Sequence, residues 1–219
     1  ILGPTLKSLE GAFTNRGTVE VKGTGDIYLV GNNGAQVRNE TLWDFQTDIA
    51  VYGINGNPLF RNLGELRKSA GTSITYLGVS SSYPVAFENL GTVKALSGTI
   101  RLFGNASLTG IYSTLPGTRV EFLGGTWTQP FVGSAVFDGG GESRFIGGTI
   151  RLLEQIPNLH LIGGTAALLP GFQAAGAITN LVLEGTILSG TNRVLGSLTC
   201  QDVSGPLSIA GSAAVTWNG

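Results

Sequence analysis

The sequence predicts an all-β fold, a right-handed parallel β-helix (β-solenoid) in which residues 1–219 form a single elongated domain. Two observations lead to this prediction: short runs of alternating apolar residues, and phrases of sequence that recur where these runs begin. The composition agrees, because 35 glycines, 42% hydrophobic residues and only 12% charged residues are typical of a chain that turns often and buries much of its surface.

The first phrase, Phe-x-Asn-x-Gly-(Thr/Glu)-(Val/Leu), occurs as FTNRGTV at 13–19, FRNLGEL at 60–66 and FENLGTV at 87–93. Stacked coils of a solenoid place each residue on its equivalent one coil away, so one position keeps one residue type. We expect the phenylalanines to stack inside, the asparagines to form an amide ladder, and the glycines to take a backbone conformation that side chains disfavour. This predicted structural ladder consists of Phe13, Phe60, Phe87, Asn15, Asn62, Asn89, Gly17, Gly64 and Gly91.

A second phrase, apolar-x-apolar-x-Gly-Gly-Thr, dominates the later part of the chain. It occurs as VEFLGGT at 120–126 and LHLIGGT at 159–165, with looser forms at 143–149 and 181–186. Its glycines add Gly125, Gly148 and Gly164 to the predicted ladder. A β-sandwich or a barrel would also contain short strands, but its strands face different neighbours and need not share a phrase. The recurrence therefore favours the solenoid.

One segment does not follow the sequence repeat. Residues 38–57, RNETLWDFQTDIAVYGINGN, lack the phrase and contain three large aromatic residues. We expect them to form an irregular excursion packed on the rod. A less regular cap or a mixed sheet over the first 50 residues is the alternative to a solenoid that begins at once.

Residues 60–104 resemble the repeats of large secreted bacterial cell-surface, adhesin-like proteins. The resemblance is carried by the order of FRNLGEL, RKSAGTSITYL, FENLGTV and LSGTIRL along this stretch. It implies a β-solenoid that is exported and displayed at the cell surface, and it brings no catalytic residues with it.

The net charge and the processing signals bear on the partners and the location that we expect for this protein. The 13 basic and 14 acidic residues leave a net charge of -1, which does not predict a nucleic-acid partner. No apolar run approaches the roughly 18 residues of a membrane span, so we expect no membrane insertion. The chain has no methionine and a single cysteine, Cys200, and we expect a mature or excised segment of an extracellular protein.

Few residues are candidates for a catalytic or metal-binding site. The close acidic pairs are Asp44 with Asp48 and Asp138 with Glu142. On strands of the second phrase, equivalent positions hold Glu121, Arg144, His160 and Val182, and their alternation with apolar residues predicts an outward row. We expect this row to be solvated surface, with a catalytic or glycan-contacting face as the alternative. We predict no catalytic residue, no cofactor and no metal site.

Aromatic side chains at loop edges can either stack on sugar rings or close the core, and the second role is the commoner one. The candidates are Tyr76, Tyr83, Tyr112, Trp127 and Trp217.

Neither terminal stretch, ILGPTLKSLE or AGSAAVTWNG, resembles an amphipathic capping helix. Solenoids need their open ends covered, so we expect end-to-end self-association or stacking on neighbouring repeats. The sequence thus predicts a non-enzymatic, extracellular structural or adhesive module with surface glycans as candidate partners. A carbohydrate-binding or carbohydrate-active β-helix protein is the alternative.

Overall fold

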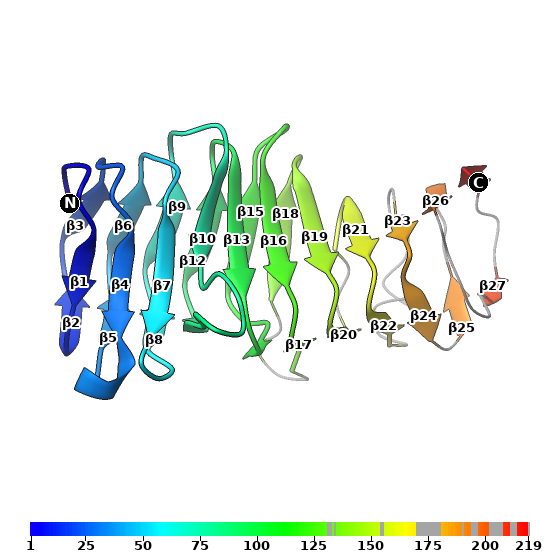
Figure 1. The fold of residues 1–219 in the computed structure, drawn as a ribbon. Helices are drawn as coiled ribbons and strands as arrows, with labels where there is room; N and C mark the ends of the chain where they lie inside the picture. Colours follow the sequence, from blue (N-terminus) through cyan, green and yellow to red (C-terminus); the bar gives the residue numbers. More distant parts are fainter. Residues whose placement is uncertain are drawn as a thin grey trace.

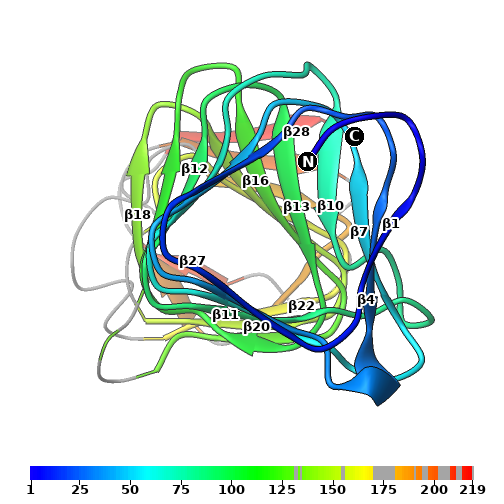
Figure 2. The same ribbon diagram turned by 90° about the vertical axis from the view of Figure 1, so that its left-hand side faces the viewer.

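The computed structural model describes residues 1–130, 133, 135–153, 156–169, 181–189, 191–193, 197–201, 208–210 and 214–218. These residues form a parallel β-solenoid, which confirms the predicted fold class (Figure 1). Seen from its N-terminal end, the chain runs clockwise as it recedes, so the solenoid is right-handed (Figure 2). Every strand pairing is parallel and joins strands of successive coils.

Sheet A runs the length of the solenoid and contains eleven strands. They are β1 (Lys7–Leu9), β4 (Ile27–Val30), β7 (Ala50–Ile54), β10 (Ile74–Leu77), β13 (Thr99–Phe103), β16 (Arg119–Leu123), β19 (Glu142–Ile146), β21 (Leu159–Ile162), β23 (Leu181–Glu184), β26 (Ser197–Gln201) and β28 (Ala214–Asn218).

Sheets B and C form the other two sides of the early coils. Sheet B contains β2 (Ala12–Asn15), β5 (Gln36–Asn39), β8 (Leu59–Asn62) and β11 (Ala86–Asn89). Sheet C contains β3 (Thr18–Val21), β6 (Leu42–Phe45), β9 (Glu65–Lys68), β12 (Thr92–Ala95), β15 (Ile111–Thr114) and β18 (Val136–Gly139).

Sheet D lies on the side of sheet B in the later coils, where β11 and β20 share one side of the solenoid (Figure 2). It contains β14 (Ala106–Ser107), β17 (Thr126–Thr128), β20 (Thr149–Leu152), β22 (Thr165–Leu168) and β24 (Ile187–Ser189). A two-stranded sheet E joins β25 (Thr191–Arg193) to β27 (Ser208–Ala210), and the short 3-10 helix η1 covers Gly31–Asn33.

The strands form where alternate residues are apolar, because alternate side chains of a strand point to opposite faces. In β10, Thr75 and Leu77 are buried, whereas Ile74 and Tyr76 are only partly buried and face outward. The inward side chains of all the sheets merge into one core along the axis. Its largest fully buried side chains include Trp127, Phe45, Phe60 and Phe122.

The predicted excursion at 38–57 is wrong. This segment supplies the end of β5, all of β6 and all of β7, each paired in register with the coils on either side. Trp43 and Phe45 are buried in the core rather than packed on the outside of the rod. The first 50 residues likewise form parallel strands, so they are part of the solenoid and not a separate cap.

An asparagine ladder runs along the corner between sheets B and C. The Nδ2 of Asn15 donates to Oδ1 of Asn39 (2.7 Å), Asn39 donates likewise to Asn62 (2.8 Å), and Asn62 to Asn89 (2.8 Å). The repeated phrase locates Asn15, Asn62 and Asn89, and Asn39 is a fourth member. Each amide also donates to a backbone carbonyl of the next coil, as Asn62 does to Thr92 O on β12 (3.0 Å). The ladder therefore closes the same turn in four coils.

The predicted phenylalanines lie at equivalent positions, with Val37 occupying that position in the second coil. Phe60 and Phe87 are buried, and their ring centroids are 6.2 Å apart. Phe13 contacts Trp43 instead of another phenylalanine, and it is 37% exposed.

The first set of predicted glycines is required for a different reason from the one expected. Gly17, Gly64 and Gly91 are not among the described residues that have a positive φ. Instead, a Cβ on Gly64 would overlap the carbonyl oxygen of Thr41, and one on Gly91 would overlap that of Gly64. A Cβ on Gly17, in the first coil, would meet nothing. Close approach of stacked backbones therefore selects glycine at Gly64 and Gly91.

The second set does need the left-handed conformation. Gly125, Gly148 and Gly164 have φ of 61°, 69° and 67°, and the glycine before each of them is left-handed too. A Cβ on Gly148 would also overlap the carbonyl oxygen of Gly125. Both restrictions act together at these corners, which explains the paired glycines of the second phrase.

Candidate functional site

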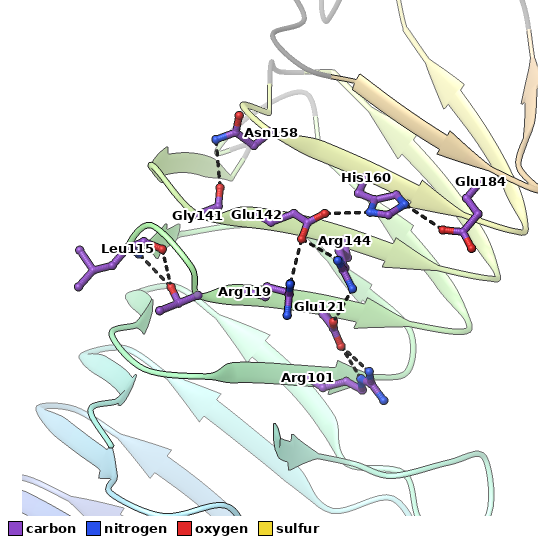
Figure 3. A network of polar contacts seen from close by, with 11 residues as sticks. Arg101, Leu115, Arg119, Glu121, Gly141, Glu142, Arg144, Asn158, His160 and Glu184 are labelled. Carbon is purple, nitrogen blue, oxygen red and sulfur yellow. Dashed lines mark hydrogen bonds and ion pairs between the residues drawn. The ribbon is translucent and has the colours of Figure 1, made fainter. Parts of the chain in front are cut away.

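The outward row expected from the second phrase lies on the outer face of sheet A. Glu121, Arg144, His160 and Val182 are register partners on successive strands β16, β19, β21 and β23. Arg101 on β13 continues the row in the preceding coil. The charged members of the row, Arg101, Glu121, Arg144 and His160, form with Arg119, Glu142 and Glu184 what we call the sheet A charge network (Figure 3).

Glu121 is the buried carboxylate of this network. Only 3% of the residue is exposed, although the sequence predicts a solvated position. Its Oε2 accepts from Nε of Arg101 at 2.7 Å, and Nη1 of Arg144 lies 3.7 Å from Oε1. The guanidinium of Arg101 in turn lies 5.3 Å from the ring centroid of Tyr76. The long arginine side chains on neighbouring strands thus cover a carboxylate that alternation alone places in water.

Glu142 is the most highly connected acid. Its Oε2 lies 2.9 Å from Nε of Arg119 and 2.9 Å from Nε of Arg144, and its Oε1 lies 2.8 Å from Nδ1 of His160. Burial by itself would raise the pKa of Glu142, but the partners His160, Arg119 and Arg144 outweigh it and lower that pKa to about 2. The carboxylate is therefore ionised at neutral pH.

His160 bridges two carboxylates on neighbouring coils. Its Nδ1 faces Glu142 on β19, and its Nε2 lies 3.2 Å from Oε2 of Glu184 on β23. A neutral imidazole donates from one nitrogen only, whereas the protonated ring donates from both. The network extends in this way across five consecutive strands of sheet A.

A hollow of about 330 Å³ lies at the start of these strands. Arg119, Glu142 and Asn158 line it together with Gly117 and Gly140, whose missing side chains leave the space open. A general acid for glycoside hydrolysis needs a raised pKa, and the pKa of Glu142 is lowered instead. The ion pairs of Glu142 with Arg119 and His160 link one coil to the next.

The close acidic pairs of the sequence are divided between separate partners. Asp44 is buried and its Oδ2 lies 2.9 Å from Nη2 of Arg67, while Asp48 pairs with Lys68. Asp138 is exposed on β18, whereas Glu142 belongs to the sheet A charge network. The structure therefore assigns each acid of these pairs a different environment.

Lys68 is a buried cation that the sequence analysis missed. Its side chain has no exposed surface, and it lies at the inward position occupied by Phe45 in the coil before. Nζ donates to the carboxylate of Asp48, to Thr75 Oγ1 (3.1 Å) and to the carbonyl oxygens of Ala70 (3.0 Å) and Thr47 (3.2 Å). The lysine organises the corner between β9 and β10. A lysine directly before a Ser-Ala-Gly turn is the one sequence signal that marks this corner.

The aromatic candidates divide into core and surface. Tyr112 and Trp127 are buried in the core, and burial raises the pKa of the Tyr112 phenol. Tyr76 lies beneath Arg101 on the outer face of sheet A. Tyr83 is 44% exposed. The side chain of Trp217 lies outside the described part of the structure.

Within the described ranges, no group of three or more His, Cys, Asp or Glu residues is placed to hold a metal ion. No helix among the described residues is long and apolar enough to cross a membrane. Comparison with protein-family models, with curated proteins and with solved structures gave no match to this chain.

Proposed function

We propose that this chain is a non-enzymatic structural and adhesive module, a rigid β-solenoid rod of the bacterial cell surface or matrix. The N-terminal face of each rod packs against a further coil of the same kind, so that rods join end to end into a fibre. Two features support a mechanical role: the asparagine ladder and the sheet A charge network both tie each coil to the next.

The observation that carries the proposal is the environment of Phe13. It occupies the same register position as Phe60, which is 1% exposed, yet Phe13 is 37% exposed. Around it, β1, β2 and β3 each have a strand partner on one side only, and at β3 the N-terminal amine of Ile1 donates to Glu20 O. Another coil would bury the phenylalanine ring and continue sheets A and B.

Support for a non-catalytic role comes from the acids of the charge network, which are occupied by cationic partners. Support for an extracellular setting comes from the resemblance of residues 60–104 to repeats of secreted bacterial surface proteins. The glycine-rich, charge-poor composition agrees with a stacked rod.

The test is the length of the particles as a function of protein concentration, measured by sedimentation velocity and by electron microscopy. We expect rods that lengthen with concentration, and we expect Phe13→Asp to shorten them. Thr14→Asp is the matched control, because Thr14 is also exposed on β2 but faces away from the core. Rods of constant length over a hundredfold range of concentration would overturn end-to-end assembly.

A further inference from the structure

On one side of the solenoid, the strands of the early coils and those of the later coils belong to different sheets. Sheet B ends with β11, and sheet D begins with β14 in the following coil, so the two strands are not members of one sheet. The loop at 78–85 between β10 and β11 projects beside this junction. A hollow of about 400 Å³ lies there, within the size range of small-molecule sites.

The lining of this hollow combines amides with apolar surface. Asn57, Ser81 and Asn105 supply polar groups, and Pro84 and Phe103 supply apolar ones, while the side chain of Val85 is buried in the core. The Oδ1 of Asn105 accepts from the backbone N–H of Thr126 at 2.6 Å, which orients the amide and leaves its NH₂ group as a donor. No charged side chain lines the hollow within the described residues. The ligand that fits is therefore uncharged, with hydroxyl groups beside an apolar face.

A row of tyrosines continues from the hollow along the outside of sheet A. Tyr83 directly precedes Pro84 of the hollow, and its ring centroid lies 5.5 Å from that of Tyr52. Tyr52 lies 5.3 Å from Tyr28, its register partner on the preceding strand. All three rings retain solvent exposure, and each carries a hydroxyl group at its edge. The rings meet edge to face, at 88° for Tyr83 with Tyr52 and 68° for Tyr52 with Tyr28, so each ring presents its own exposed apolar surface to a pyranose while its hydroxyl bonds to sugar hydroxyls.

We infer that this surface, the hollow with the tyrosine row, binds a neutral oligosaccharide. One sugar ring occupies the hollow against Phe103 and bonds to the Asn105 amide, and the chain continues over Tyr83 and Tyr52. The inference deepens the adhesive part of the proposed function by naming its ligand class. Charge argues against an anionic chain or a nucleic acid here, because no charged side chain among the described residues lines the hollow to pair with a phosphate or a carboxylate.

Isothermal titration of the purified chain with neutral oligosaccharides (gluco-, xylo- and manno-oligomers) tests the inference, with oligogalacturonate and a sulfated oligosaccharide as charged arms. We expect saturable binding of at least one neutral series. Tyr83→Ala should weaken it about tenfold or more. Asn105→Asp keeps the acceptor for Thr126 but removes the NH₂ donor, and it should weaken binding comparably.

Phe13→Ala is the matched control, an exposed aromatic removed at the N-terminal face, and it should leave sugar affinity unchanged while it affects rod length. Tyr83→Ala should do the reverse, so failure of the glycan site and failure of end-to-end assembly are separately visible. Thermal unfolding of each variant shows whether it is folded. Absence of binding to every neutral series, preference for the charged arms, or parent-like affinity in the Tyr83→Ala and Asn105→Asp variants would each overturn the inference.

Discussion

The Nδ2 of Asn39 donates to Oδ1 of Asn62 at 2.8 Å, and both side chains are completely buried. A buried amide has two donors and an acceptor to satisfy, and stacking identical amides satisfies them in every coil at once. Because Asn39 and Asn62 are each both donor and acceptor to neighbouring asparagines, loss of either one disturbs the coil above and the coil below.

Asn62→Ala should therefore destabilise the solenoid by about 3 kcal/mol, since it leaves the NH₂ of Asn39 and the Oδ1 of Asn89 without their partner. Chemical denaturation monitored by circular dichroism measures this change. Arg61→Ala is the control on the same strand: its partner Glu88 is 39% exposed, so the cost should stay below about 1 kcal/mol. Similar losses in the two variants would contradict the role assigned to the ladder.

Gly64→Ala should destabilise the protein by at least about 2 kcal/mol, because the added methyl group overlaps the Thr41 carbonyl oxygen of the coil beneath. Gly17→Ala, at the same place in the repeated phrase, should be close to neutral, because a Cβ there meets nothing. Denaturation midpoints of the two variants test the contrast. If both substitutions cost the same, close approach between coils is not what selects glycine.

The repeated phrases predicted the class of fold and the positions of most corners, because stacking makes a residue type recur. They did not identify the second coil, where other residue types occupy the positions of the phrase. Val37 replaces the phenylalanine and Thr41 replaces the glycine around Asn39, so the second coil did not match the phrase. The hydroxyl of Thr41 donates to Gly17 O, which accommodates the larger residue at this corner.

Side-chain environments were harder to predict than strand positions. Alternation correctly predicted that Glu121 leaves the core, but its burial depends on Arg101 and Arg144 from two other coils. Lys68 breaks the alternation, since a cation takes the inward position that Phe45 holds one coil earlier. Neither side-chain environment can be predicted from the sequence of a single strand. Both depend on which residues register brings together.

Lys68→Met should destabilise the protein by about 3 kcal/mol, because Asp48 and Thr75 lose their buried cationic partner while the volume of the side chain is kept. Lys94→Met is the matched control on the neighbouring strand β12, where the lysine lies on the partly exposed outer face. That variant should change stability by less than about 0.5 kcal/mol. Thermal unfolding at neutral pH distinguishes them, and a stable Lys68→Met variant would show that the corner does not need the charge.

The charge network predicts a defined dependence of stability on pH. The pKa of Glu142 is lowered to about 2 in the folded protein, so its ionised form contributes stability that is fully present above its unfolded pKa of 4.5. This stability is lost as the pH falls from about 4.5 towards 2. We expect Glu142→Gln to lower the unfolding temperature by several degrees at pH 7 and the difference from the parent protein to shrink progressively below pH 4. Glu65→Gln is a matched control, because Glu65 makes a 3.5 Å ion pair at the surface and should give a small difference at every pH. A Glu142→Gln effect of the same size at pH 2.5 and pH 7 would mean that the carboxylate acts through packing and not through its charge.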